Sequence, residues 1–192
     1  MRLHYKGKYN LDPSSLPQGE HQPNAVPFKE AKDTRTLGLI ANGIAIGIIV
    51  VLYAMLLLRG GTAMFTGFFW GAILAILTLF PHEFLHAICF KEDVWLYTNL
   101  KQGMLFVIGP ETMSKSRFIF MSLLPNIVFG WIPFVLGMIF PNLSALGIMG
   151  ALATGMGAGD YYNVCNAVTQ MPKGARTYLH GFHSYWYLPE KK

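Results

Sequence analysis

Residues 37–58 restrict the fold of this chain more than any other stretch, because they form an apolar segment without a charged side chain. A helix rises about 1.5 Å per residue, so a helix of this length can span a hydrocarbon core of about 30 Å. Three further apolar runs follow, at residues 63–90, 118–140 and 143–168. Only 13% of the residues are charged, against about 25% in an ordinary soluble domain. The sequence therefore predicts a membrane protein with four transmembrane helices.

The remaining segments are more polar. Residues 1–36 are rich in proline and are expected to form a loosely structured cytoplasmic tail, with a second cytoplasmic tail at 170–192 and the transmembrane domain at 37–169. Residues 94–108 are rich in aromatic and β-branched side chains and are broken by Lys-Gln-Gly, which predicts a short cytoplasmic β-hairpin between the second and third helices. The expected fold class is thus all-α, with four transmembrane helices and this one hairpin. The hairpin either packs over the helix ends or offers an edge strand to an extended peptide.

Lysine and arginine gather on one side of the predicted membrane. The N-terminal tail holds six, residues 91–117 hold four and the C-terminal tail holds four, which is fourteen of the fifteen in the chain. Only Arg59 falls in a connection on the other side. Because cytoplasmic loops carry an excess of these residues, both termini are predicted to be cytoplasmic.

Two function classes are disfavoured by the same composition. The net charge of +5 comes from dispersed basic residues without an arginine-rich run or an aromatic RNA-binding signature, so no nucleic-acid partner is expected. Cys89 and Cys165 lie in apolar stretches and form no spacing motif. We interpret both as small hydrophobic side chains, not as a disulfide or a thiol metal site.

The second apolar run contains the pattern H-E-x-x-H, formed by His82, Glu83 and His86. On a helix, histidines four residues apart lie on one face, so both imidazoles can bind one zinc ion, and the neighbouring Glu83 can act on an attacking water. A solvated helical face is the alternative, but ionisable groups at membrane depth cost a few kcal/mol unless they are paired or functional. Pro81 removes one backbone hydrogen bond just before the motif, which either kinks the helix or is simply tolerated.

Asp160 is the leading candidate for a third protein ligand. It is the charged residue of the fourth run, and nine residues separate it from Thr169, as eight separate His82 from Phe90. At about 1.5 Å per residue, both side chains lie roughly 12 to 13 Å from the cytoplasmic helix ends. Three nearby glycines would let another helix approach closely: Gly155, Gly157 and Gly159.

Alternatives to this assignment stay open. Asp160 could instead pair with a buried polar group such as Asn126 or Asn163. Asn126 follows Pro125 at the same depth in the third run, where it either donates a hydrogen bond to a substrate carbonyl or oxyanion or holds the helices together. Rival metal ligands lie in the polar stretches of the cytoplasmic side: Glu92, Asp93, Glu111, His180 and His183.

These residues carry a resemblance to known proteins. An H-E-x-x-H near the cytoplasmic end of one helix, Pro-Asn in the next and Gly-Asp in the last resemble the site-2-protease class of intramembrane zinc metalloproteases, and more closely a family of small, four-helix, bacterial-type zincin peptidases. The resemblance extends over nearly the whole chain after residue 36, including "SRFIFMSLLPNIVFG" and the terminal "MPKGARTYLHGFHSYWY". It implies zinc ligands at His82, His86 and Asp160, and Glu83 as general base. Asp160 is followed by Tyr161, where the larger proteases have glycine.

The sequence thus predicts a membrane-embedded zinc metallopeptidase that hydrolyses a peptide bond near the cytoplasmic face. Its expected partners are the lipid bilayer and a membrane protein or peptide substrate. The alternative is a catalytically silent membrane scaffold that binds metal or captures a partner helix. A silent enzyme would usually lose its general base, so the presence of Glu83 favours the enzyme.

Overall fold

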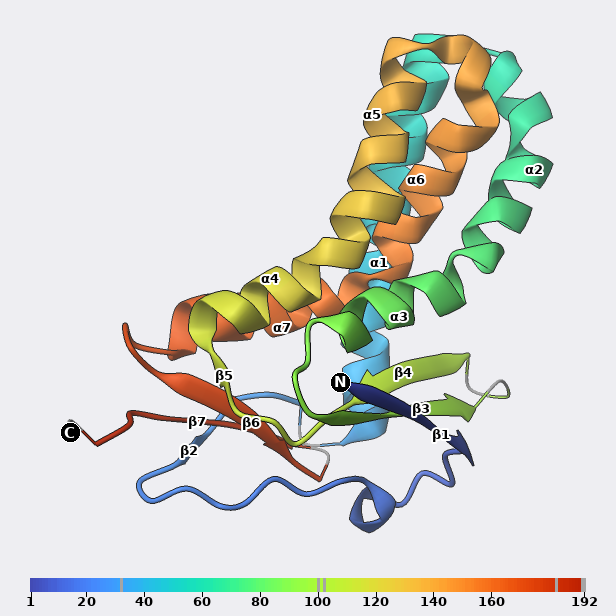
Figure 1. Ribbon diagram of the computed structural model, residues 1–192. Coiled ribbons are helices and arrows are strands. Elements are labelled where there is room, and N and C mark those ends of the chain that lie inside the picture. The colour runs from blue at the N-terminus through green and yellow to red at the C-terminus, as the bar shows by residue number, and fades with distance from the viewer. Residues whose placement is uncertain (32, 100, 102, 182, 191–192) are drawn as a thin grey trace. The chain divides into compact units, whose positions relative to one another are not determined.

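The computed structural model describes residues 1–31, 33–99, 101, 103–181 and 183–190 (Figure 1). The chain divides into two compact units, and the division falls within helices α3, α4 and α7. We call Ala31–His82 with Leu123–Tyr162 the membrane unit. The sheet unit is made of Met1–Glu30, Glu83–Ser122 and Asn163–Lys192.

Helices form the membrane unit, and α6 packs against α1, α2 and α5 (Figure 1). Their packing is close because small residues meet: a side chain on Gly137 or Gly147 would collide with the backbone of the other helix. Leu56 and Ile148 are fully buried in this core. The helical elements given for the described residues, some of which belong partly to the sheet unit, are α1 (Thr34–Gly60), α2 (Ala63–Leu77), α3 (Leu79–Ile88), α4 (Lys115–Pro125), the π-helical turn η3 (Asn126–Trp131), α5 (Ile132–Ile139), α6 (Ser144–Met156) and α7 (Ala158–Gln170), with short 3₁₀ turns η1 (Pro13–Ser15) and η4 (Pro141–Leu143).

Local signals in the sequence explain both ends of α1. The Asp33 carboxylate accepts a hydrogen bond from the Thr36 backbone N–H at 2.8 Å, which satisfies a donor at the helix start. Gly61 ends the helix with a φ of 57°, a conformation that favours glycine. Both ends of the first apolar run are therefore encoded locally.

Three helices among the described residues are long and apolar enough to cross a membrane, which supports a membrane protein. They are Arg35–Gly60, Ala63–Ile88 and Lys115–Ile139. The predicted four-helix count is wrong, because the run at 143–168 divides at Gly157 into α6 and α7. Each half has 13 residues and rises only about 20 Å, so neither half alone crosses a core of about 30 Å, whereas α6 and α7 in succession are long enough to return the chain across it.

The prediction of an all-α fold with a single hairpin is also wrong, because the sheet unit contains two β-sheets. The first has the order β1-β3-β4, with β1 (Arg2–Lys8) parallel to β3 (Asp93–Asn99) and β3 antiparallel to β4 (Met104–Ile108). The pairing of β3 with β4 confirms the predicted hairpin. Gln102, in its Lys-Gln-Gly break, lies outside the described residues.

The second sheet has the order β2-β7-β6-β5. Its strands are β2 (Val26–Pro27), β5 (Met113–Ser114), β6 (Arg176–His180) and β7 (His183–Tyr187). Both terminal segments therefore contribute strands, and the expectation of a loosely structured N-terminal tail is wrong. Tyr9 and Leu16 from that segment are buried against Tyr97 and Ile108, because the aromatic and aliphatic residues interspersed among its charges supply one layer of a core.

Candidate metal centre

Helix α3 carries the H-E-x-x-H residues. The second apolar run is interrupted at Thr78, and the His82 backbone N–H donates to the Thr78 carbonyl at 2.8 Å in the first turn of α3. Because α3 is regular from there, side chains three and four residues apart share a face. The ligand atoms of His82, Glu83 and His86 all lie within 4.8 Å of one another. Among the described residues, this is the group of three or more histidine, cysteine or acidic side chains that could hold a metal ion.

Asp160 approaches His82 within the membrane unit. Asp160 lies in the first turn of α7, and its Oδ2 is 3.1 Å from His82 Nε2. The two side chains are only 13% and 15% exposed. Two ligands of a tetrahedral zinc ion, each about 2.1 Å from the metal, are separated by about 3.4 Å. The observed separation is that of a hydrogen-bonded pair and is also close to that of two ligands of one ion.

Asn126 also faces Asp160. It begins the π-helical turn η3, directly after Pro125 ends α4. Its side chain is buried, and Nδ2 donates a hydrogen bond to Asp160 Oδ2 at 2.7 Å. Isolated π-helical turns are frequent at functional sites. The sequence shows the Pro-Asn pair but carries no local signal for a π-helical turn.

Glu83 and His86 are each oriented by the backbone of the sheet unit. The Val107 N–H donates to Glu83 Oε2 at 2.9 Å. His86 Nδ1 lies 3.0 Å from the Met121 carbonyl oxygen, which can only accept, so Nδ1 carries the hydrogen. Nε2 is then the nitrogen of His86 that can bind a metal. Metal-binding histidines commonly hold their other ring nitrogen in this way.

Three of the rival ligands in the polar stretches, Asp93, His180 and His183, contact other groups of the sheet unit. Asp93 pairs with Arg2 at 3.2 Å and with His4 at 3.4 Å. His180 Nδ1 donates to the Gly19 carbonyl at 2.8 Å, and His183 lies 3.5 Å from Glu30. Within the described residues, none of the five belongs to a group that could hold a metal.

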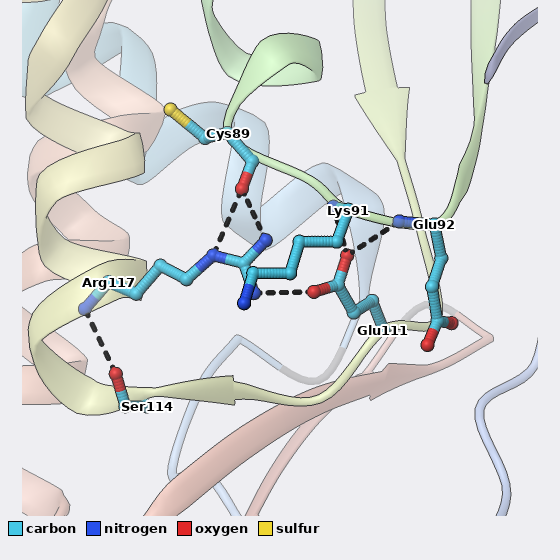
Figure 2. Close-up of polar contacts among 6 residues, drawn as sticks. All are labelled: Cys89, Lys91, Glu92, Glu111, Ser114 and Arg117. Atoms are coloured by element: carbon cyan, nitrogen blue, oxygen red, sulfur yellow. Dashed lines mark hydrogen bonds and ion pairs between the residues drawn. The ribbon is translucent and has the colours of Figure 1, made fainter. Parts of the chain in front are cut away.

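Glu111, which is buried, and Arg117, which is partly buried, form an ion pair that sequence reasoning missed (Figure 2). The Arg117 guanidinium also donates to the Cys89 carbonyl, just beyond the end of α3, at 3.0 Å and 2.5 Å. The Lys91 and Glu92 backbone N–H groups donate to the Glu111 carboxylate at 2.6 Å and 3.1 Å. The pair thus joins the end of α3 to the segments that lead into β3 and α4.

The charge state of Glu111 follows from these contacts. Burial raises the pKa of its carboxyl group, but the hydrogen bonds from Arg117 and the two backbone N–H groups outweigh burial, and the net pKa lies below its usual value. Glu111 is therefore ionised at neutral pH. It is better explained as a structural anion than as the metal ligand considered from the sequence.

Comparison with known proteins gives a family match. The model of a family described as "Putative zincin peptidase" matches residues 75–176, which is more than half of the chain. The matched segment includes α3, the π-helical turn and Asp160. No curated protein and no solved structure matches the chain.

Proposed function

Because the chain belongs to this family of zincin peptidases, we propose that it is a membrane-embedded zinc endopeptidase, similar in its chemistry to the site-2 proteases. The observation that carries the proposal is the approach of Asp160 Oδ2 to His82 Nε2 at 3.1 Å, beside an H-E-x-x-H helix whose ligand atoms converge within 4.8 Å. An apolar helical setting without a functional partner would disfavour these polar groups.

The proposed zinc ligands are His82, His86 and Asp160. Two imidazoles and one carboxylate form a donor set typical of catalytic zinc, which leaves a fourth position open. The fit is supported by the short distance between Asp160 and His82 and by the Nδ1–H of His86, which leaves Nε2 for a metal. Zinc at this site would supply a Lewis acid that polarises the scissile carbonyl group and acidifies a water molecule.

Glu83 is the proposed general base. Its carboxylate takes a proton from the attacking water as the new C–O bond forms, and then gives that proton to the leaving amine nitrogen as the C–N bond breaks. The Val107 N–H holds one oxygen of the carboxylate at 2.9 Å, so the group is oriented before substrate binds. Asn126 is proposed to assist the reaction through the hydrogen bond that it donates to Asp160.

The outer edge of β4 is the proposed docking site for the substrate backbone. Val107 donates to Glu83, so its N–H points away from β3 and toward the proposed base. An extended peptide that pairs with this edge would bring its backbone beside Glu83. A helical membrane substrate would first have to unwind, because its own hydrogen bonds shield its peptide bonds. The proposed substrate is therefore an unwound segment of a membrane protein or peptide.

The proposed orientation puts both termini and the reaction near the cytoplasmic face. Its support is the distribution of lysine and arginine, fourteen of fifteen of which lie in the terminal segments and in residues 91–117.

The function is tested by comparing purified full-length wild type with Glu83→Gln on membrane peptides in detergent micelles, with zinc content measured on the same samples. Glutamine keeps the shape of Glu83 but cannot accept the proton, so zinc should stay bound while turnover falls by about 10² to 10⁴. Glu92→Gln is the matched control and should keep full turnover. Undiminished turnover in Glu83→Gln contradicts the assigned base. Zinc binding without hydrolysis in the wild type favours the silent scaffold.

A further inference from the structure

Asp160 is held by a neighbour that lies entirely within the membrane unit. Asn126 is 1% exposed, and its Nδ2 donates at 2.7 Å to the Oδ2 atom of Asp160 that faces His82 at 3.1 Å. A neutral amide donor fixes the rotation of a carboxylate without cancelling its charge. The side chain of Asp160 can therefore keep both its direction and its affinity for a cation.

Gly157 determines whether Asn126 fits. Its φ of −78° and ψ of 16° are accessible to any residue, so glycine is not required there by the backbone. A Cβ atom at this position would, however, overlap Asn126 Oδ1 and lie 2.6 Å from Cγ and 2.9 Å from Nδ2. All three of these nearest atoms belong to the amide group of Asn126. The amide group of Asn126 thus occupies the space that a side chain at position 157 would fill.

We propose that Gly157 and Asn126 form a positioning pair that orients the Asp160 carboxylate toward His82 for metal binding. This inference rests on the proposed zinc site. Gly157 shapes the space, Asn126 supplies the hydrogen bond, and Asp160 is the group that contacts the metal. Neither Gly157 nor Asn126 has to touch zinc or substrate in this role. Partners that orient a metal ligand typically contribute about 10- to 100-fold in metal affinity.

The test measures the zinc affinity of full-length protein in detergent micelles by competition with a chromophoric chelator, together with the rate of peptide hydrolysis. Asn126→Ala removes the donor and should weaken zinc binding by about 10- to 100-fold. Gly157→Ala should do the same, because its new methyl group displaces the amide. Gly159→Ala is the matched control: it lies two residues away, and apart from its own helix backbone and chain neighbours a Cβ there meets no described atom within 4 Å. That variant should bind zinc as the wild type does.

The double variant Gly157→Ala with Asn126→Ala separates positioning from general helix packing. The atoms that the new methyl group would meet are absent once residue 126 is alanine, so the double variant should bind zinc as weakly as Asn126→Ala alone and no more weakly. Losses that add in the double variant overturn the proposal, since they would mean that Gly157 acts independently of Asn126. Circular dichroism on each variant verifies that the helices are retained.

Failure of this inference is distinct from failure of the proposed zinc site. If the wild type binds zinc and Asp160→Ala releases it, while Asn126→Ala and Gly157→Ala keep wild-type affinity, the positioning pair is refuted and the zinc site stands. If the wild type does not bind zinc, both proposals are refuted.

Discussion

Replacing Arg117 with alanine should destabilise the sheet unit by about 3 kcal/mol, because the Glu111 carboxylate then stays buried without its cationic partner Arg117. The side chain of Glu111 is only 6% exposed and that of Arg117 is 24% exposed, and Glu111 loses this cationic partner in the variant. Removing one partner of a buried ion pair typically costs about 3 to 5 kcal/mol. Two backbone N–H groups continue to donate to the carboxylate, so we expect the lower end of that range.

The assay is urea unfolding of full-length protein in detergent micelles at pH 7, followed by tryptophan fluorescence, to which Trp95 and Trp186 of the sheet unit contribute. Arg2→Ala is the control, because the Arg2 side chain is 83% exposed and its ion pair with Asp93 at 3.2 Å should contribute less than about 1 kcal/mol. Adding Glu111→Gln to the Arg117 variant should restore part of the loss, since it removes the buried charge. A loss below about 1 kcal/mol, or a double variant less stable than Arg117→Ala, would refute the reasoning.

Three further predictions concern the pH dependence of stability, metal binding and membrane orientation. The pKa of Glu111 lies below its ordinary value of 4.5 in the folded chain, so its contribution to stability is full above that value and is lost as the pH falls through the folded pKa; urea titrations between pH 6 and pH 3 should show a steeper loss for wild type than for Glu111→Gln, and equal slopes would contradict this. Asp160→Ala should lose most bound zinc, measured by elemental analysis, while the double variant His180→Ala with His183→Ala should keep it; the reverse result would transfer the ligand role to the histidines. A reporter fused to the C-terminus should behave as cytoplasmic and one inserted at Asn142 as external, and the opposite pattern would overturn the orientation.

Local patterns in the sequence predicted the features that depend on neighbouring residues. The uncharged run at 37–58 gives α1, and the β-branched and aromatic residues at 94–108 give the hairpin of β3 and β4. The separation of β3 from β1 in sequence is about ninety residues, and their parallel pairing leaves no local signal. Glu111 and Arg117 are only six residues apart, but this is not a spacing at which side chains of a helix meet, so their contact could not be found from the sequence.

The sequence likewise predicted some features of the candidate site and missed others. Helical rise alone predicted that His82 and Asp160 lie at the same depth, and the structure has them 3.1 Å apart. Their role as zinc ligands stays a prediction. The division of the fourth run at Gly157 was missed because glycine is common in membrane helices. Its consequence depends on Asn126, a residue of a different helical segment, so only the three-dimensional structure connects the two.

X-ray absorption at the zinc K-edge of the purified full-length protein tests the central claim most directly. If His82, His86 and Asp160 hold the metal, the spectrum will show two imidazole nitrogens at about 2.0 to 2.1 Å and carboxylate or water oxygens at about 2.0 to 2.2 Å. The imidazole contribution should fall by half in His86→Ala protein reconstituted with zinc. A sulfur ligand at about 2.3 Å, or an imidazole contribution that does not change in that variant, would contradict the proposed centre.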